Sequence, residues 1–372
     1  MAKARADPGY CLFLAERMLD LLPRFRDEID GVRNGEDVEA VHRMRVASRR
    51  LRAVLPLLSS CTGRRELRRW QRELRQVTRA LGAARDTDVR IDFVLTFAAR
   101  LPRGAGRHGR NAAPPAAGQF PSFRTMLPRL GLDPERRCEL EDALPASVGP
   151  ADQQGIECLL LRLVQQREAL QPGVLAALDR LEERRLLDRM TDRAGRVEAR
   201  ARNAGVRARS AAALEAAHRN ARLRCDEVLS HAPALRDPGR VAEHHAMRIA
   251  TKRLRYTLET FAPLYDDGLK AEVKALRRLQ EALGRLHDCD VWIEELPIFL
   301  DEEHARTLAY FGHDAYLRSI EPGVRQLLAD RVAARERLHA STLADWEKLE
   351  RDQYVERLLD RLAAERAAGA PA

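Results

Sequence analysis

Apolar residues recur along this chain of 372 residues at spacings of three and four, which is the period of an amphipathic helix. In the stretch Tyr10–Val32, for example, Leu14, Met18 and Phe25 fall on one face. Segments that alternate apolar and polar residues, as half-buried strands do, are almost absent. The pattern therefore predicts an all-α fold.

Glycine and proline interrupt the helical pattern and predict where the helices end. We expect Gly31–Asp37 to form a turn, Gly82 to stop a helix and Pro322–Gly323 to break another. Pro102–Pro121 has no periodicity and is expected to be a mobile, exposed loop. The predicted helices are Tyr10–Val32, Val38–Leu58, Arg64–Leu81, Val89–Leu101, Asp152–Leu170, Val174–Asn203, Val206–His231, Ala242–Phe261, Leu269–Leu283 and Asp345–Arg366.

Two motifs occur twice in the same order. His42–Arg52 and His245–Arg255 are identical at seven of eleven positions, with an offset of 203 residues. Leu-Gly followed by Asp-x-Asp-Val recurs at Leu81–Val89 and Leu283–Val291, with an offset of 202 residues. Because order and spacing are both kept, we predict a tandem duplication that gives two pseudo-symmetric helical bundles. The expected domains are residues 1–204 and 205–368, divided at Gly205.

The positive charge of the chain is concentrated in the first of these motifs. The two copies together hold nine Lys and Arg residues and no acid, which equals the formal net charge of +9. The remaining 56 basic and 56 acidic residues balance. Positive charge confined to two duplicated segments favours a binding site for a polyanion.

On a helical wheel, each basic motif places its cations on one face and its apolar residues on the other. Like charges four residues apart destabilise a helix, so an uninterrupted basic stripe favours a ligand site over a plain solvated face. The predicted binding residues are His42, Arg45, Arg49 and Arg52 with His245, Arg248, Lys252 and Arg255. Residues of the following helices are expected to add secondary contacts, namely Arg72, Arg75, Lys274 and Arg277.

The histidines and the paired aspartates bring in further chemistry. Neighbouring cations should lower the pKa of His42 and His245, and a bound polyanion should raise it. Asp86 and Asp88, like Asp288 and Asp290, suggest either magnesium ligands or helix N-caps. We favour the structural role, with the carboxylates also able to orient arginines of the stripes, and expect neither a metal nor another cofactor.

The six cysteines are isolated and match neither a zinc motif nor a small disulfide scaffold. Reduced cysteines in a cytoplasmic protein fit this pattern. No apolar run is long enough to span a bilayer, and the polar start lacks the apolar core of a signal peptide. We therefore expect no membrane association.

The duplicated motifs resemble those of the CHAD family, the conserved histidine α-helical domain. In this chain they read His-x-Met-Arg-[VI]-x-[ST]-[RK]-Arg-Leu-Arg and Leu-Gly-x-x-[RH]-Asp-x-Asp-Val, and the likeness extends from about Tyr10 to Arg366. The resemblance implies two helical bundles whose basic helices line a central groove or pore that binds inorganic polyphosphate. It further implies no catalytic residues and a possible association with polyphosphate granules and their proteins. The triphosphate-tunnel (CYTH) domain that many members carry is not evident here.

Two other functions remain open from the sequence. The same basic surface would suit nonspecific binding of nucleic acid, although aromatic residues for base stacking are missing from both stripes apart from nearby Tyr256. An enzyme of polyphosphate or diphosphate metabolism would instead need magnesium and would depend on Asp86 or Asp288. We expect a binding protein and not an enzyme.

Overall fold

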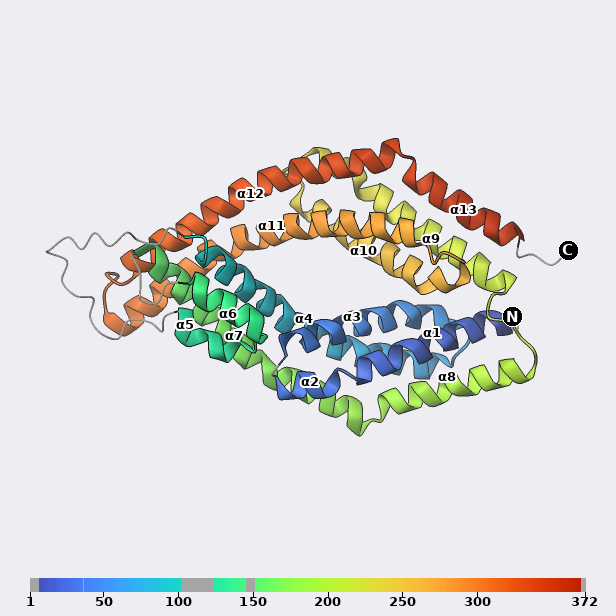
Figure 1. Cartoon of the computed structure of the whole chain (residues 1–372). Helices are drawn as coiled ribbons and strands as arrows, with labels where there is room; N and C mark the ends of the chain where they lie inside the picture. The colour runs from blue at the N-terminus through green and yellow to red at the C-terminus, as the bar shows by residue number, and fades with distance from the viewer. Residues whose placement is uncertain (1–6, 36, 102–122, 145–150, 369–372) are drawn as a thin grey trace.

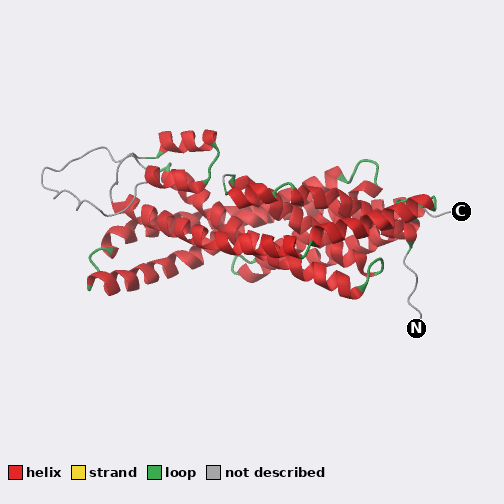
Figure 2. Cartoon of the chain, turned by 90° about the horizontal axis from the view of Figure 1, so that it is seen from below, coloured by secondary structure: helices red, strands yellow, loops and turns green. Residues whose placement is uncertain are grey.

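The computed structural model describes residues 7–35, 37–101, 123–144 and 151–368. Every regular element in these ranges is a helix, as Figure 2 shows. The prediction of an all-α fold is confirmed. The predicted loop Pro102–Pro121 lies outside the described residues.

The first part of the chain forms eight α-helices and two short 3₁₀ helices. These are α1 (Pro8–Arg26), α2 (Ile29–Asn34), α3 (Val38–Val54), η1 (Leu55–Ser59), α4 (Arg64–Ala98), α5 (Phe123–Met126), η2 (Leu127–Leu130), α6 (Pro134–Ala143), α7 (Ala151–Glu183) and α8 (Leu186–Asn203). The second part forms α9 (Ala211–His231), η3 (Ala232–Arg236), α10 (Val241–Phe261), η4 (Ala262–Leu264), α11 (Lys270–Phe311), α12 (Leu317–Arg351) and α13 (Tyr354–Ala368).

The two parts lie one above the other in Figure 1 and meet at the end opposite the termini. In the first part α1 packs on α3 and α8, α3 packs on α4, and α4 packs on α7. In the second part α9 packs on α10 and α13, α10 packs on α11, and α11 packs on α12. This equal order of partners agrees with a tandem duplication, although the duplication itself and the domain boundary stay predictions.

Two hydrophobic cores hold the parts together. The larger core combines α1, α3 and α4 with α9, α10 and α11, and in it Phe13 stacks on Phe261 with ring centroids 5.6 Å apart. The smaller core joins α4, α7, α11 and α12 at the far end, where Trp292 packs against Phe93. Because both cores contain residues from both parts, burial of apolar surface fixes how the two parts sit against each other.

Short polar side chains start the helices that meet near the N-terminus. The Asp7 carboxylate accepts a hydrogen bond from the Tyr10 amide and caps α1. Ser210 caps α9 through the Ala213 amide, and its hydroxyl also donates to Asp7. A single carboxylate therefore ties the beginning of the first part to the beginning of the second.

Several predicted helix boundaries are wrong. The predicted first helix is divided, since α1 ends at Arg26 and α2 ends at Gly35, which has a left-handed backbone. Gly82 does not stop a helix, because α4 runs through it with Leu74, Leu81 and Ala84 all buried on one face. A glycine inside a helix costs about 1 kcal/mol relative to alanine, and continued burial on both sides offsets this.

The boundaries of the later helices are wrong for the same reason. α11 continues from the predicted Leu269–Leu283 to Phe311, and Pro322 lies inside α12. A proline inside a helix removes one backbone hydrogen bond. Ile320 and Val324 on either side are fully buried in the smaller core, which keeps the helix continuous. The predicted last helix is divided between the end of α12 and α13.

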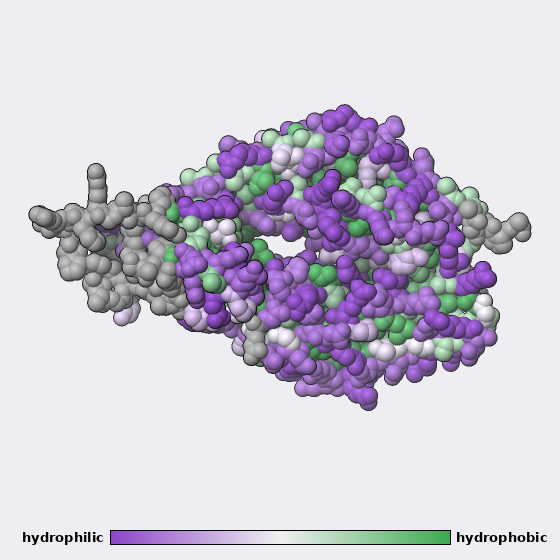
Figure 3. Space-filling view, in the orientation of Figure 1, coloured by the Kyte–Doolittle hydropathy of each residue, from purple (hydrophilic) through white to green (hydrophobic). Residues whose placement is uncertain are grey.

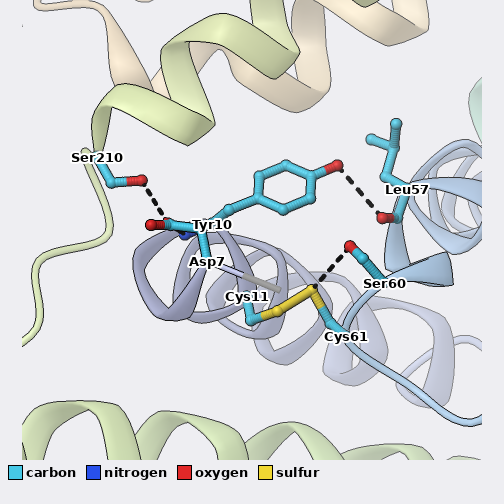
Figure 4. The surroundings of a disulfide bond; sticks show 7 residues. All are labelled: Asp7, Tyr10, Cys11, Leu57, Ser60, Cys61 and Ser210. Atoms are coloured by element: carbon cyan, nitrogen blue, oxygen red, sulfur yellow. Dashed lines mark hydrogen bonds between the residues drawn. A yellow bond between two sulfur atoms is a disulfide. The ribbon is translucent and has the colours of Figure 1, made fainter. Parts of the chain in front are cut away.

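Cys11 in α1 and Cys61 in the segment after η1 form a disulfide, shown in Figure 4. The expectation of reduced cysteines is therefore wrong for this pair, while Cys138, Cys158 and Cys225 are among the free cysteines. The two partners lie 50 residues apart in sequence, and the isolated positions gave no signal of their pairing. The disulfide closes the loop that contains α3, so it restricts the unfolded chain around the first basic stripe.

We predict that the unfolded protein exposes four reactive thiols without reductant and six after reduction. Cys11→Ser should lower the free energy of unfolding by about 2–4 kcal/mol, because it removes a loop constraint from the unfolded state. Thiol titration and urea denaturation check both statements. Cys138→Ser, at an exposed free cysteine, is the matched control and should change little. Six reactive thiols without reductant would contradict the disulfide.

Candidate functional site

The two basic stripes lie on α3 and α10, which contact each other across the two parts of the chain. The opposite faces of these helices are fully buried, with Met44 and Leu51 in α3 and Met247 and Leu254 in α10. The buried residues fix the rotation of each helix about its axis. The predicted amphipathic character of both segments is confirmed.

Three cations from the two stripes come together where the helices meet. Burial lowers the pKa of Arg248 and Lys252 on α10, and the positive charge of Arg49 on α3 lowers the pKa of both further. We call Arg49, Arg248 and Lys252 the basic cluster. All three are partly buried, and none forms an ion pair with an acid in the described part of the chain.

The lack of acidic partners does not extend along all of α3, since a neighbouring arginine of that helix does have such partners. Arg43 is more exposed than the cluster residues, yet it pairs with both Glu28 and Asp37 at 2.8 Å. Ion pairs of this kind are common on the surface of this protein. The basic cluster therefore lacks ion pairs among the described residues, on a protein whose other arginines often have carboxylate partners, and the nearby Asp288 offsets part of the charge of Arg248.

Lys252 carries the clearest electrostatic sign of this concentration. Burial, followed by the positive charges of Arg49, Arg248 and Arg45, lowers its pKa to about 8. A cation that is partly buried among other cations is destabilised in its charged form. A bound polyanion would raise the pKa of Lys252 again and stabilise its charged form.

Figure 3 shows a small opening that passes through the molecule between the two parts. In the same orientation, Figure 1 places α3, α4, α10 and α11 around this region. The basic stripes are on two of these helices and the Asp-x-Asp motifs are on the other two. That the predicted site residues line this opening stays a prediction.

The Asp-x-Asp motifs lie inside α4 and α11, so the prediction that they cap helix ends is wrong. Asp86 accepts a hydrogen bond from the Arg45 guanidinium at 2.8 Å. Its counterpart Asp288 lies close enough to Arg248 for the positive charge to lower its pKa, although crowding by protein atoms raises that pKa overall. The second idea, that these carboxylates orient arginines of the stripes, agrees with this geometry.

The second aspartate of each motif has a different role. Asp88 pairs with Arg167 of α7 at 2.7 Å, and Asp290 pairs with Arg335 of α12. Both pairs are largely shielded from solvent. These aspartates therefore join α4 and α11 to the neighbouring long helices, which keeps the motif carrying Asp86 and Asp288 in place.

The glycines of the same motif lie beneath the stripe arginines. A Cβ atom on Gly82 would be 4.0 Å from Nε of Arg45, and one on Gly284 would be 3.8 Å from Nε of Arg248. Both distances correspond to ordinary van der Waals contact, so each arginine lies directly against the glycine of the neighbouring helix.

The two predicted histidines have different neighbours. His42 is partly buried beside Arg85, and burial followed by this arginine lowers its pKa. Nδ1 of His245 lies 3.2 Å from Nδ1 of His287, with the two rings in contact. Burial lowers the pKa of His245 as well, and lowers that of His287 to about 4. The predicted depression of both pKa values is confirmed, with burial as the largest cause.

The ends of the two stripes are not equivalent. Arg52 is exposed, and the charges near it are the cations Arg75 and Arg49. Arg255 is held inside, where it donates to Gln280 at 2.8 Å and pairs with Glu259. Arg45 and Arg255, unlike the basic cluster, thus already have protein carboxylates as partners.

The predicted secondary contacts also fall in different surroundings. Arg72 is exposed and lies 3.5 Å from Glu73, while Arg75 is near Arg52. Lys274 and Arg277 are exposed and line a cavity between the two parts, together with Arg50 of α3. The structure therefore brings the second pair, but not Arg72, into a concave basic surface.

The sequence prediction missed four residues that surround the stripes. Arg85 and His287 occupy equivalent positions of the Leu-Gly motif and contact the two predicted histidines. Their shared place in a duplicated motif was a signal that could have identified them. Arg50 and Glu259 pair across the two parts at 3.4 Å, and no repeat marks this contact.

The described residues contain no group of three or more His, Cys, Asp or Glu side chains placed to hold a metal ion. Asp86 and Asp288 are near each other, but each also lies beside an arginine of a stripe. Among the helices of the described ranges, none is long and apolar enough to cross a membrane.

Comparison with known proteins now gives the site its context. The sequence profile of the CHAD domain matches residues 16–297, which include both basic stripes and both Asp-x-Asp motifs. A crystal structure of the CHAD domain from the plant Ricinus communis is similar, with a TM-score of 0.50 and 24% identity. The match covers 91% of this chain and 94% of the plant chain, and it supports the fold. A search of curated proteins gave no match. Since the profile covers well over half of the sequence, this chain belongs to the CHAD family.

Proposed function

We propose that this protein binds inorganic polyphosphate at the basic cluster. The observation that carries the proposal is the meeting of Arg49, Arg248 and Lys252 from two distant parts of the chain, partly buried and without an ion pair to any described residue. Placing like charges together in this way costs free energy. A polyanion that binds between the two helices would remove that cost.

Polyphosphate suits the site because it is a flexible chain of charged groups without bases or other features to recognise. A site for it needs rows of cations and little else, and arginine offers a planar pair of donors for phosphate oxygens. Each stripe is about 15 Å long, which presents several cations in line. The CHAD family is associated with polyphosphate binding in general, which supports the same ligand.

Nucleic acid is the competing ligand. Proteins that bind single strands usually add aromatic side chains on which bases stack. Tyr256, the aromatic residue next to the stripe, is 9% exposed and its ring lies 4.5 Å from the Arg255 guanidinium. Its face is therefore already occupied, which favours a ligand without bases.

We further propose that binding is not accompanied by cleavage and takes place in the cytoplasm, with polyphosphate granules and their proteins as partners. Asp86 is bonded to Arg45, and Asp288 lies beside Arg248. An aspartate that neutralises an arginine is a poor magnesium ligand. Incubation with polyphosphate and magnesium should leave the chain length unchanged on a gel. Shortening that Asp86→Asn abolishes would support an enzyme instead.

The direct test is binding of long-chain polyphosphate at about 0.15 M salt with single-stranded DNA as competitor. Tight binding that excess DNA does not displace is expected. Arg49→Gln with Arg248→Gln should weaken binding and reduce the log–log salt slope by about 0.7 for each lost contact. The matched control is Arg43→Gln, an exposed residue of α3 that pairs with Glu28 and Asp37 and lies outside the basic cluster. Ready displacement by DNA would identify a general polyanion surface.

Lys252→Met should act in opposite directions on binding and on stability. The pKa of Lys252 in the folded protein, about 8, lies below its ordinary value of 10.5. The unfolded chain therefore holds the proton more tightly, so the charged lysine destabilises the free protein below about pH 8, and this penalty fades as the pH approaches 10.5. At pH 7 the variant should gain about 1–3 kcal/mol in the free energy of unfolding and lose polyphosphate affinity.

Urea denaturation at neutral and alkaline pH measures this effect. The gain in the free energy of unfolding should be largest at pH 7 and should disappear near pH 10.5, the ordinary pKa of lysine. Lys270→Met is the control, because Lys270 is exposed and forms no ion pair in the described part of the chain. A loss of stability in Lys252→Met would show that the lysine supports the fold and does not await a ligand.

Polyphosphate binding should strengthen as the pH falls from about 7.5 to 5.5. The pKa values of His42 and His245 are lowered in the free protein by burial and by neighbouring cations, and a bound polyanion should raise them. His42→Gln with His245→Gln should flatten the dependence, whereas His304→Gln, on the exposed side of α11, should not. Binding measured over this range, with equal dependence in all variants, would exclude the histidines from the site.

The free protein should lose stability over a pH range that overlaps the range of the binding experiment but lies lower. The folded-state pKa of His287, about 4, lies below its ordinary value of 6.5, so stability is lost as the pH falls through that interval. Binding measurements above about pH 5.5 stay clear of the largest loss. Thermal unfolding at each pH shows which part of a change in binding comes from the fold.

A further inference from the structure

A second basic surface lies beside the stripes. A cavity of about 580 Å³ opens between α1, α3, α10 and α11, and we call it the side cavity. Its lining includes two acids, Asp20 and Glu259. The basic residues that line it are Arg17, Arg24, Arg50, Lys270, Lys274 and Arg277. Cations therefore exceed carboxylates by four, and they come from both parts of the chain.

Half of these cations have no acidic partner in the described ranges. Asp20 is shared by Arg17 and Arg24, at 3.2 and 2.7 Å. Arg50 has Glu259 as its partner. The three cations of α11 that line the cavity form no ion pair there, namely Lys270, Lys274 and Arg277. The α11 wall of the cavity is thus open to an anionic ligand.

The side cavity adjoins the basic cluster. Tyr256 lines the cavity, and the same residue is near enough to Arg45 and Arg248 to influence the pKa of both. On α3, Arg50 of the cavity follows Arg49 of the cluster directly in sequence. A flexible ligand in the cluster could therefore continue into the cavity without leaving basic surroundings.

Glu259 stands between the two sites. Its carboxylate accepts from Arg50 of the first part at 3.4 Å and pairs with Arg255 of its own helix. The position equivalent to Glu259 in the first part, by the offset of 203 residues, is Pro56. The acid is therefore absent from the first stripe, where the exposed Arg52 has no carboxylate partner among the described residues. A carboxylate held between two guanidinium groups resembles a bound phosphate in charge and geometry.

We propose that the side cavity is a second phosphate-binding site, and that Glu259 occupies its phosphate position next to the basic cluster in the free protein. A long polyphosphate chain bound at the cluster displaces Glu259 from Arg50 and Arg255 and extends along the α11 wall. A short phosphate such as tripolyphosphate fills the cluster alone. This inference rests on the proposed function.

Removal of the internal carboxylate should tighten binding, contrary to the usual effect of changing a site residue. Glu259→Gln frees two arginines from a charge-assisted contact, so affinity for long-chain polyphosphate should rise about tenfold. The log–log salt slope should become steeper by about 1.4, since two more contacts form. The control is Glu281→Gln, which removes one acid from the exposed side of α11. A role of Glu259 in the fold alone would give unchanged or weaker binding.

The α11 wall of the side cavity is tested separately. Its exposed residues can be substituted without disturbing the fold. Lys274→Gln with Arg277→Gln should weaken binding of long-chain polyphosphate at least fivefold and leave binding of tripolyphosphate within about twofold of wild type. The control removes the same charge outside the cavity, by Arg278→Gln with Arg285→Gln, two exposed residues of α11. Equal losses in the two double variants would reduce the effect to overall charge.

The outcomes separate this inference from the proposed function. If wild type binds both ligands and neither Glu259→Gln nor the cavity variant differs from its control, the side cavity is not a site and the proposed function stands. If wild type binds neither ligand at about 0.15 M salt, the proposed function itself fails. Tighter binding by Glu259→Gln together with a loss confined to long chains in the cavity variant establishes the second site.

Discussion

Repulsion between like charges where α3 meets α10 is the constraint on which the rest of this protein depends. Arg49, Arg248 and Lys252 stay close because the other faces of both helices are buried in one core, with Met44 and Met247 fully covered. Burial of apolar surface thus holds together charges that would separate if the two helices were free. The lowered pKa of Lys252 is the local sign of that balance.

The protein limits this repulsion without removing it. Arg45 is neutralised by Asp86 from α4, and Asp288 of α11 acts on Arg248 in the second part. Those helices are in turn held by Asp88 and its counterpart through ion pairs to α7 and α12. Carboxylates therefore pair with Arg45 and lie near Arg248, whereas Arg49 and Lys252 form no ion pair among the described residues. Under the proposed function, an anion bound at this site would reduce the repulsion that remains between these cations.

The two parts of the chain pack their helices in the same order but differ in the contacts that equivalent residues make. In the first part Arg52 is exposed and free of acids, while its counterpart Arg255 is held by Glu259 and Gln280. The histidines differ in the same manner, since His42 has an arginine neighbour and His245 has another histidine. A ligand that follows both stripes therefore meets two different surroundings, and this gives the site a direction.

The sequence by itself determined the all-α class, the two basic stripes and the phase of each stripe relative to the core, because the helical period is a local property of the chain. It also indicated the direction of the pKa shift of the two histidines, whereas burial and, for His42, Arg85 of α4 contribute to that shift only in the folded structure. It did not determine where helices end. Gly82 and Pro322 are helix breakers in isolation, but burial of Leu81 and Ile320 against other helices overrides them.

Only the tertiary structure decided which charges remain free. Arg52 and Arg255 are equivalent in the repeat, yet Arg52 forms no ion pair among the described residues and Arg255 pairs with Glu259. The pairing of Cys11 with Cys61 and of His245 with His287 likewise depends on helices that are distant in sequence. Such contacts follow from how whole helices pack, and no local pattern records them. The sequence thus specified the cations, and the packing of the two parts decided which of them have carboxylate partners among the described residues.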